Sequence, residues 1–357
     1  MHTHSKASAP TLPPVIEKYL EETYPSDLPG AVVAILRHGE VIHKSAYGLA
    51  DMHRGIPMSV DCVHRIGSLT KQFTAAAIML LHERKLLSLD DALTTHLPGY
   101  PARGHAIRLS HLLNHTAGVA CYTDGDDFET VEASDLSQQQ VLDLFQHAPL
   151  MSVPGTRFSY SNSGYFLLGL VIESVSGTPL AEFFHRHIFT PLGMRSTALE
   201  GYLGTWPIQG YTLEPGLQLA PAISMSIPFS SGALVSTVDD LIRWEAGMGH
   251  AGLLPAAAWQ RMWEPTVLPS GETCFYGYGF ERRSVYGLTV IDHDGGISGF
   301  TSYSARTPDR SLFVCVLSNN DSGDPSTIDV GETIIRALSA CRAHTQSEFL
   351  GHEHAAA

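Results

Sequence analysis

The sequence has few basic residues, and only five of its 357 residues are lysines. Lys and Arg together number 22 against 36 Asp and Glu, which gives a formal net charge of −14. This charge repels phosphate backbones, and no Lys/Arg-rich tract is present that could bind an anionic membrane. We therefore expect neither nucleic acid nor a membrane among its partners.

Cysteines and long apolar runs are also scarce. The cysteines are odd in number, widely spaced and without a C-x-x-C pair: Cys62, Cys121, Cys274, Cys315 and Cys341. This pattern predicts free thiols in a reducing compartment. The longest apolar runs, such as 166–172, are too short to cross a bilayer, and no signal-peptide pattern opens the chain. We expect a cytoplasmic protein, with the reservation that a sequence whose signal had been removed would look the same.

The composition is globular, with 44% hydrophobic and 16% charged residues, and the length suits two packed subdomains. Strand-like runs gather toward both chain ends, at 31–36, 41–48, 276–280, 288–291, 300–305 and 312–317. Helical patterns occupy 68–81, much of the middle of the chain including 162–176, and 327–340. Because tight turns join neighbouring strands, we expect an α+β fold with a largely antiparallel sheet.

The order of these elements predicts a discontinuous organisation. Residues 14–84 and 201–345 are expected to form a sheet domain, and 85–200 a mostly helical subdomain inserted into it, with tails at 1–13 and 346–357. Within the chain, Ser137 and Gln140 form a capping-box pattern, and a short helix is expected to begin at Ser236 or Thr237.

The first chemical motif is Ser68-x-x-Lys71. A spacing of three puts both side chains on one helical face. A serine hydroxyl needs a base, and a lysine can be that base if burial lowers its pKa. Lys71 is the one lysine with a serine three residues before it, and an apolar helix follows it. The structural alternative is a helix-capping serine with a solvated lysine.

The second motif, Tyr160-Ser161-Asn162, lies between a Pro-Gly turn and a predicted helix. The Tyr160 hydroxyl can relay a proton to a leaving group, and the Asn162 amide can hold Lys71 or a substrate carbonyl. The alternative is a tyrosine packed at a loop, with Asn162 as the helix N-cap.

The third motif, His293-Asp294-Gly295-Gly296, follows the strand-like run 288–291. Glycines at such a place let a substrate lie along a strand edge, so His293, Gly295 and Gly296 are candidate substrate-binding residues. The amides of Gly296 and Ser68 could together hold an oxyanion. The alternative is a β-turn with an exposed histidine.

Taken together, the three motifs resemble the active-site-serine penicillin-recognising family, which includes class C β-lactamases, DD-peptidases, D-aminopeptidases and related esterases. In that family Ser-x-x-Lys, Tyr-x-Asn and Lys/His-x-Gly follow in this order on a helix, a loop and a strand. Three further segments between about residues 30 and 320 are similar to the family's: Leu-Leu-Asn-His-Thr-Ala-Gly at 112–118, Pro-Leu-Gly-Met at 191–194 and Ser-Gly-Ala-Leu-Val-Ser-Thr at 231–237.

The resemblance implies a β-lactamase/transpeptidase-like fold and an acyl-enzyme mechanism. Ser68 would attack a carbonyl, Lys71 and Tyr160 would share the base and acid roles, and Asn162 would position Lys71 or the substrate. The amides of Ser68 and Gly296 would hold the oxyanion. Which of Lys71 and Tyr160 is the base stays open, because coupled groups share their protons.

One departure bears on the substrate. The third motif has a histidine in place of a lysine, and no lysine follows Lys85, so strong β-lactamase activity is not expected. Histidine at this place is typical of the DD-peptidase, D-aminopeptidase and esterase branches. Since peptidoglycan chemistry needs export, we expect a carboxylesterase acting on small esters. The alternative is a D-aminopeptidase, amidase or DD-peptidase-like enzyme with weak β-lactamase activity.

Two other classes remain as alternatives: an acyltransferase that uses the same acyl-enzyme, and a non-catalytic scaffold with the same fold. His111 and His115 have zinc-like spacing but lack the accompanying glutamate, so no metal and no cofactor are expected.

Tyr276, Tyr278 and Phe280 alternate like a half-buried strand or line the mouth of a cleft. Loops 120–135 and 200–230 are expected to build the pocket walls. The sequence leaves the oligomeric state open.

Overall fold

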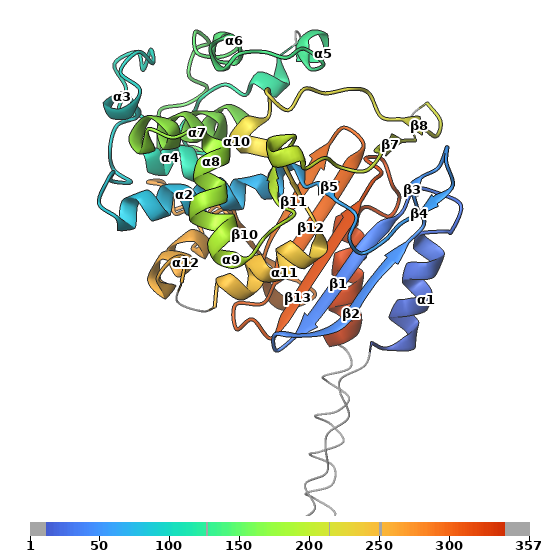
Figure 1. The fold of residues 1–357 in the computed structure, drawn as a ribbon. Helices are drawn as coiled ribbons and strands as arrows, with labels where there is room; N and C mark the ends of the chain where they lie inside the picture. Colours follow the sequence, from blue (N-terminus) through green and yellow to red (C-terminus); the bar gives the residue numbers. More distant parts are fainter. Residues whose placement is uncertain (1–11, 126–127, 214, 250–251, 340–357) are drawn as a thin grey trace, which may run out of the picture.

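The computed structural model describes residues 12–125, 128–213, 215–249 and 252–339. These residues form a six-stranded sheet with helices on both faces and a mostly helical region beside it (Figure 1). The combination confirms the predicted α+β class.

The six-stranded sheet joins the two ends of the chain in the order β10-β11-β12-β13-β1-β2, with every neighbouring pair antiparallel. Its strands are β1 (Ala31–Arg37), β2 (Glu40–Tyr47), β10 (Glu281–Val285), β11 (Leu288–Ile297), β12 (Phe300–Arg306) and β13 (Leu312–Ser318). β13 pairs directly with β1, where Val316 lies opposite Val33. Alternate residues of these strands therefore face opposite layers of helices.

One face of the sheet is covered by α1 (Pro14–Thr23) and by the helix at 327–339. Leu20 and Ile334 are fully buried there against Val33 and Val316. The predicted closing helix is thus present, although its expected last residue, 340, lies outside the described residues.

The other face carries the helices that lead to the site. α2 (Thr70–Glu83) is buried along most of its length and packs against α7 (Asn162–Ser176) and α10 (Phe229–Gly232). α11 (Val238–Gly247) covers the part of this face near β1 and β13. The remaining helices are α3 (Leu93–His96), α4 (Leu109–Leu113), α5 (Phe128–Val131), α6 (Gln138–Asp143), α8 (Leu180–Phe184), α9 (Thr190–Leu192) and α12 (Ala256–Trp263).

Short elements complete the fold. β3 (Leu49–Asp51) pairs with β4 (Ile56–Pro57), β9 (Leu234–Ser236) lies between β5 (His64–Arg65) and β6 (Ala198–Leu199), and β7 (Tyr211–Thr212) pairs with β8 (Gln218–Leu219). Single turns of 3-10 helix occur at η1 (Gly67–Leu69), η2 (Tyr122–Asp124) and η4 (Tyr202–Gly204), and a π-helical turn at η3 (His185–Phe189).

Several local signals specify these elements as expected. α7 has the predicted bounds and ends at Gly177, whose φ of 65° is the left-handed conformation that stops a helix. Ser137 and Gln140 make the predicted capping box of α6, and Thr237 caps α11. The helix at the first motif begins as η1 and continues as α2 from Thr70.

The strand predicted at 276–280 is wrong. Every residue from 276 to 280 is buried, including the two glycines, whereas a half-buried strand would bury alternate residues. The intervening glycines permit this, because a Cβ on Gly277 would lie 2.2 Å from the Met262 carbonyl oxygen. The backbone at Gly277 therefore packs directly against the backbone of α12, and the edge strand β10 starts only at Glu281.

The structure also corrects the predicted position of the third motif and the exposure of its histidine. β11 runs on to Ile297, so the motif lies within the strand rather than after it. His293 is 2% exposed, which excludes the alternative of a turn with an exposed histidine.

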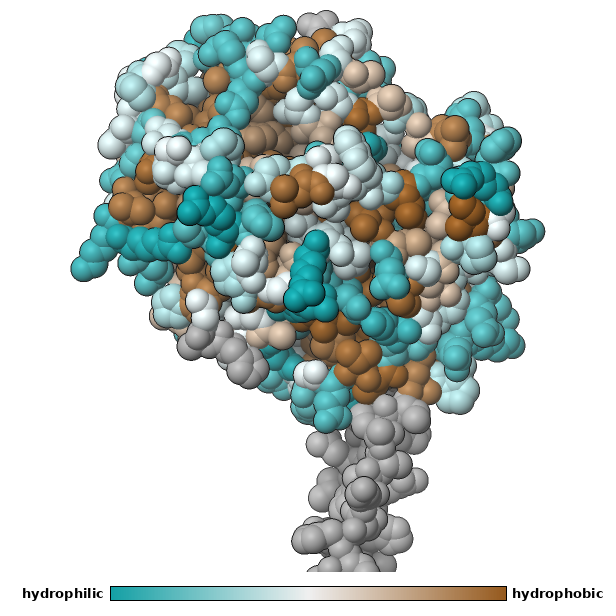
Figure 2. Space-filling model, viewed as in Figure 1, coloured by the Kyte–Doolittle hydropathy of each residue, from teal (hydrophilic) through white to brown (hydrophobic). Residues whose placement is uncertain are grey.

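Figure 2 shows hydrophilic side chains over much of one face, with hydrophobic ones in several separate groups. Cys62, Cys121, Cys274 and Cys315 are free thiols, as predicted, and Cys341 lies outside the described residues. Among the described helices, none is by itself long and apolar enough to span a membrane; α7 and 180–192 reach that length and composition only as a pair bent by 78°.

Candidate active site

Ser68 lies in η1, at the entrance to the buried helix α2. Gly67, with φ of 49°, lets this turn pack directly on β11: a Cβ there would lie 3.0 Å from the Gly296 nitrogen. The turn and the strand edge therefore meet backbone to backbone, and Ser68 is held between α2 and β11.

Lys71 brings the first two motifs together. Its Nζ lies 2.9 Å from Ser68 Oγ, 2.8 Å from Asn162 Oδ1 and 2.9 Å from the Ser231 carbonyl oxygen. The side chain is fully buried, so the solvated lysine of the structural alternative is excluded. Asn162 is the first residue of α7 and Ser161 is its N-cap, which frees the Asn162 amide for Lys71.

Burial dominates the electrostatics of Lys71. Desolvation lowers the pKa of Lys71 to about 7, against smaller opposing effects of Cys121 and Asp294. The ammonium also lies 4.8 Å from the ring centroid of Tyr160. A lysine with this pKa is present in both its charged and neutral forms near neutral pH.

Tyr160 also contacts Ser68. Its hydroxyl lies 2.9 Å from Ser68 Oγ, and the residue is 36% exposed. Desolvation of the hydroxyl raises the pKa of Tyr160 well above its usual value, although the bond to Ser68 acts in the other direction. The tyrosine is therefore neutral at physiological pH, and its hydroxyl carries a proton that it can donate.

The loop that carries Tyr160 is held by His115. The His115 carbonyl accepts from Ser159 N at 2.8 Å, and its Nδ1 accepts from Ser161 N at 3.1 Å. The imidazole stacks against Tyr160 with ring centroids 4.2 Å apart. Burial lowers the pKa of His115 well below its usual value, so the ring stays neutral and its Nδ1 stays an acceptor. The sequence indicated His115 as part of a similar segment but did not indicate this contact.

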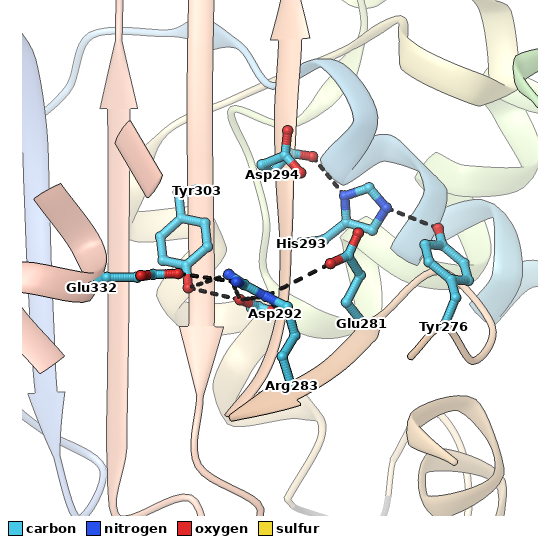
Figure 3. Close-up of polar contacts among 8 residues, drawn as sticks. All are labelled: Tyr276, Glu281, Arg283, Asp292, His293, Asp294, Tyr303 and Glu332. Atoms are coloured by element: carbon cyan, nitrogen blue, oxygen red, sulfur yellow. Dashed lines mark hydrogen bonds and ion pairs between the residues drawn. The ribbon is translucent and has the colours of Figure 1, made fainter. Parts of the chain in front are cut away.

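His293 is buried beside the site and has a partner on each ring nitrogen. Nε2 lies 2.8 Å from the Tyr276 hydroxyl, and Nδ1 lies 2.6 Å from the Asp294 carbonyl oxygen (Figure 3). Desolvation lowers the pKa of His293, so the imidazole is neutral. Tyr276, expected in a half-buried strand or at a cleft mouth, instead orients this histidine.

The backbone of the third motif runs along η1. A Cβ on Gly295 would lie 2.2 Å from the Ile66 carbonyl oxygen and 3.0 Å from Ser68 N. Gly296 follows on the same strand, and nothing lies within 4 Å of where its Cβ would be. The amides of Ser68 and Gly296 thus belong to two backbone segments in direct contact, with open space beside Gly296.

A cavity of about 290 Å³ opens next to Ser68. Most of its wall area is apolar. The walls are formed by Ser68 and Asn162 together with residues of 122–132, 223–232 and 296–298, among them Tyr122, Phe128, Glu132, Ile223, Ile227, Pro228, Gly296, Ile297 and Ser298. Loops 120–135 and 200–230 thus contribute wall residues, and the apolar lining suits an acyl group of modest size.

The site thus consists of a serine that contacts a buried lysine and a tyrosine, at the junction of a helix and an antiparallel sheet. The Beta-lactamase family matches this chain over residues 16–338. The chain therefore belongs to that family, and its fold is the β-lactamase/transpeptidase fold.

The relatives of this chain differ in activity. It is 28% identical to "Penicillin-binding protein 4*" of Bacillus subtilis, over 79% of this chain and 66% of that protein. It is 30% identical to "Esterase EstB" of Burkholderia gladioli, over 70% of this chain and 62% of that protein. Among solved structures, a D-amino acid amidase from Ochrobactrum anthropi SV3 matches with a TM-score of 0.78 and 26% identity, covering 92% of this chain and 99% of the other. The chain spans about two thirds of the length of these two curated relatives.

Proposed function

We propose that the chain is a serine hydrolase that forms an acyl-enzyme on Ser68 and acts on small esters. The observation that carries this proposal is the position of Ser68 Oγ, 2.9 Å from both Lys71 Nζ and the Tyr160 hydroxyl. A serine hydroxyl that contacts both a proton acceptor and a proton donor can lose its proton when it attacks a substrate and regain a proton when the product leaves.

In the proposed cycle, Ser68 Oγ attacks the carbonyl carbon as its proton passes to the Lys71–Tyr160 pair. The amides of Ser68 and Gly296 stabilise the oxyanion. The C–O bond to the leaving alcohol then breaks, and the alcohol takes the proton back through Tyr160. Water attacks the acyl-enzyme next, which releases the acid and returns the proton to Ser68.

Two observations favour esters over β-lactams and carboxylate-bearing peptides. His293 is neutral and hydrogen-bonded on both nitrogens, so it offers no charge to a substrate carboxylate. Most of the wall area of the cavity is apolar, and the charged residue among those that line it is the carboxylate Glu132. An amide of a D-amino acid is the second candidate, supported by the likeness to the D-amino acid amidase.

Hydrolysis of p-nitrophenyl butyrate by wild type and Ser68→Ala tests the proposal. We expect kcat to fall by about 10³ or more in Ser68→Ala, because the nucleophile is lost. The matched control Ser26→Ala, at an exposed position, should keep wild-type activity. A fluorophosphonate probe should label wild type and the control but not Ser68→Ala.

Equal activity of Ser68→Ala and wild type would overturn the proposal. Turnover of D-phenylalanine amide without turnover of the ester would make the second candidate the function. Product analysis with an added alcohol acceptor separates hydrolysis from acyl transfer, because a transferase would form the new ester in preference to the free acid.

A further inference from the structure

The structure gives the two ends of a bound substrate different surroundings. A carbonyl held by the amides of Ser68 and Gly296 has the apolar cavity along 296–298 on one side. Tyr160 lies on the other side, with its ring centroid 6.3 Å from that of His293. Because Tyr160 is the proposed proton donor to the leaving group, the acyl part belongs in the cavity and the leaving group belongs beside His293 and Asp294.

The cations around this region are already engaged. Lys71 is held by Ser68, Asn162 and Ser231. Arg65 makes a bidentate pair with Glu200 at 2.7 and 2.9 Å. Arg283 lies among Asp292, Tyr303 and Glu332, with an ion pair of 3.0 Å to Glu332 (Figure 3). A carboxylate on the leaving group would find these three cations paired.

Asp294 is different, because its carboxylate has no hydrogen bond or ion pair to the described part of the chain. The side chain is partly exposed. β10 pairs with β11 only as far as Asp292, so among the described strands none flanks β11 on that edge at Asp294. Figure 3 shows Asp294 beside His293 and apart from the Arg283 group. Its charge reaches the reacting groups, since it raises the pKa of both Lys71 and Tyr160.

We propose that Asp294 makes the site select esters whose leaving alcohol carries a positive charge, such as an amino alcohol or a quaternary ammonium alcohol. This inference rests on the proposed acyl-enzyme chemistry at Ser68. An unpaired carboxylate at a half-open edge attracts a cation and repels a carboxylate at the same place. The cationic group takes no part in bond making: the ester C–O bond breaks and the alcohol leaves with its charge unchanged.

Three butyrate esters of similar size test the charge preference directly: butyrylcholine, its neutral carbon analogue 3,3-dimethylbutyl butyrate, and the butyrate ester of 3-hydroxypropanoate, which is anionic. For wild type we expect kcat/KM to be about 10-fold higher for the choline ester than for the neutral ester, and lower again for the anionic one. The preference should weaken as salt is added, because salt screens a partly exposed charge.

Asp294→Asn removes the charge and keeps the shape, so the ratio of kcat/KM between the choline and neutral esters should fall close to one. The matched control is Glu22→Gln, an exposed carboxylate on α1 at the opposite face of the sheet, which should leave the ratio at its wild-type value. A second test uses wild type alone. Choline, which carries the positive charge, should inhibit about 10-fold better than its neutral analogue 3,3-dimethylbutanol.

The outcomes separate this inference from the proposed function. If wild type hydrolyses p-nitrophenyl butyrate but treats the choline and neutral esters alike, or Asp294→Asn keeps the wild-type ratio, the role of Asp294 is overturned and the hydrolase stands. If wild type turns over none of the esters and Ser68 fails to react with the fluorophosphonate probe, the proposed function itself has failed.

Discussion

The hydrogen-bond partners of Lys71 suit both the charged and the neutral form of its side chain. Its three acceptors match the three N–H groups of an ammonium, whereas a neutral amine has two N–H groups and a lone pair. Asn162 and the Ser231 carbonyl can keep the two N–H groups of the neutral form, which leaves the lone pair for Ser68. The surrounding contacts therefore accommodate both states of a proton-accepting lysine.

This arrangement predicts the pH dependence of the enzyme. Because the pKa of Lys71 is lowered to about 7, the charged form dominates below that pH and cannot accept the Ser68 proton. We expect kcat/KM for p-nitrophenyl butyrate to rise with pH through a midpoint near 7 and to level off above it. Stopped-assay rates between pH 5.5 and 9 measure the profile.

The control for this profile is Lys44→Met, which removes a partly exposed lysine paired with Asp239 and should keep the same midpoint. A profile that is flat across pH 7, or one that rises only near the ordinary pKa of lysine, would contradict the proposal that neutral Lys71 accepts the Ser68 proton.

At the scale of elements, the contact between η1 and β11 positions Ser68, the proposed nucleophile. It depends on glycine at two facing positions, Gly67 and Gly295, because each Cβ would meet backbone atoms. Backbone atoms cannot rotate away as a side chain can, so the two segments would have to separate.

Gly295→Ala is therefore expected to cost stability and activity together. The new Cβ would lie 2.2 Å from the Ile66 carbonyl oxygen, so we expect a loss of stability of about 1–3 kcal/mol. As Ser68 N shifts from its place, the turnover of p-nitrophenyl butyrate should fall by about 10-fold or more. Urea unfolding and steady-state kinetics measure the two effects.

Gly99→Ala is the matched control, since nothing lies within 4 Å of its Cβ position and the variant should resemble wild type in both assays. Wild-type stability and turnover in Gly295→Ala would show that η1 and β11 are not in the close contact described above.

At the same scale, local patterns predicted most helices and hairpins. Gly177 ended α7 at the expected place, and Thr237 capped α11. The prediction failed at 276–280, where alternating aromatic residues and glycines imitated a half-buried strand. Close backbone packing against α12 decided the conformation there, and residue alternation carries no information about such a contact.

Across the whole molecule, Asn319 ties distant segments together. Its buried side chain accepts from Gly30 N at 2.8 Å and donates to the carbonyl oxygens of Leu49 and Gln209 at 3.1 and 2.9 Å. These partners come from the start of β1, from β3 and from the chain leading to β7. One amide thus joins the central sheet to the smaller sheets beside it.

Asn319→Ala should therefore destabilise the protein by about 2–4 kcal/mol, because several buried backbone groups lose their partner at once. The exposed amide of Gln139 donates to Asp143, and Gln139→Ala should cost less than about 0.5 kcal/mol. Guanidinium unfolding of both variants measures the difference; a cost for Asn319→Ala no larger than that of the control would contradict this role.

The sequence by itself determined what depends on near neighbours along the chain. The spacing of Ser68 and Lys71, the limits of α7 and the hairpin of β1 and β2 follow from helical period, capping and strand propensity, which act over a few residues. The order of three motifs along the chain also sufficed to indicate the family, which the match over residues 16–338 then showed. The predicted division into 14–84 with 201–345 and 85–200 stays a prediction.

Only the tertiary structure decided which distant groups meet and how their charges are balanced. The contact of Lys71 with Asn162 spans 91 positions of the chain, and that of Gly67 in η1 with Gly296 in β11 spans more than 200. Burial of Lys71 and His293, and the unpaired carboxylate of Asp294, follow from these long-range contacts. A residue's pKa and its free partners depend on everything packed around it, and packing is a property of the folded chain rather than of any segment.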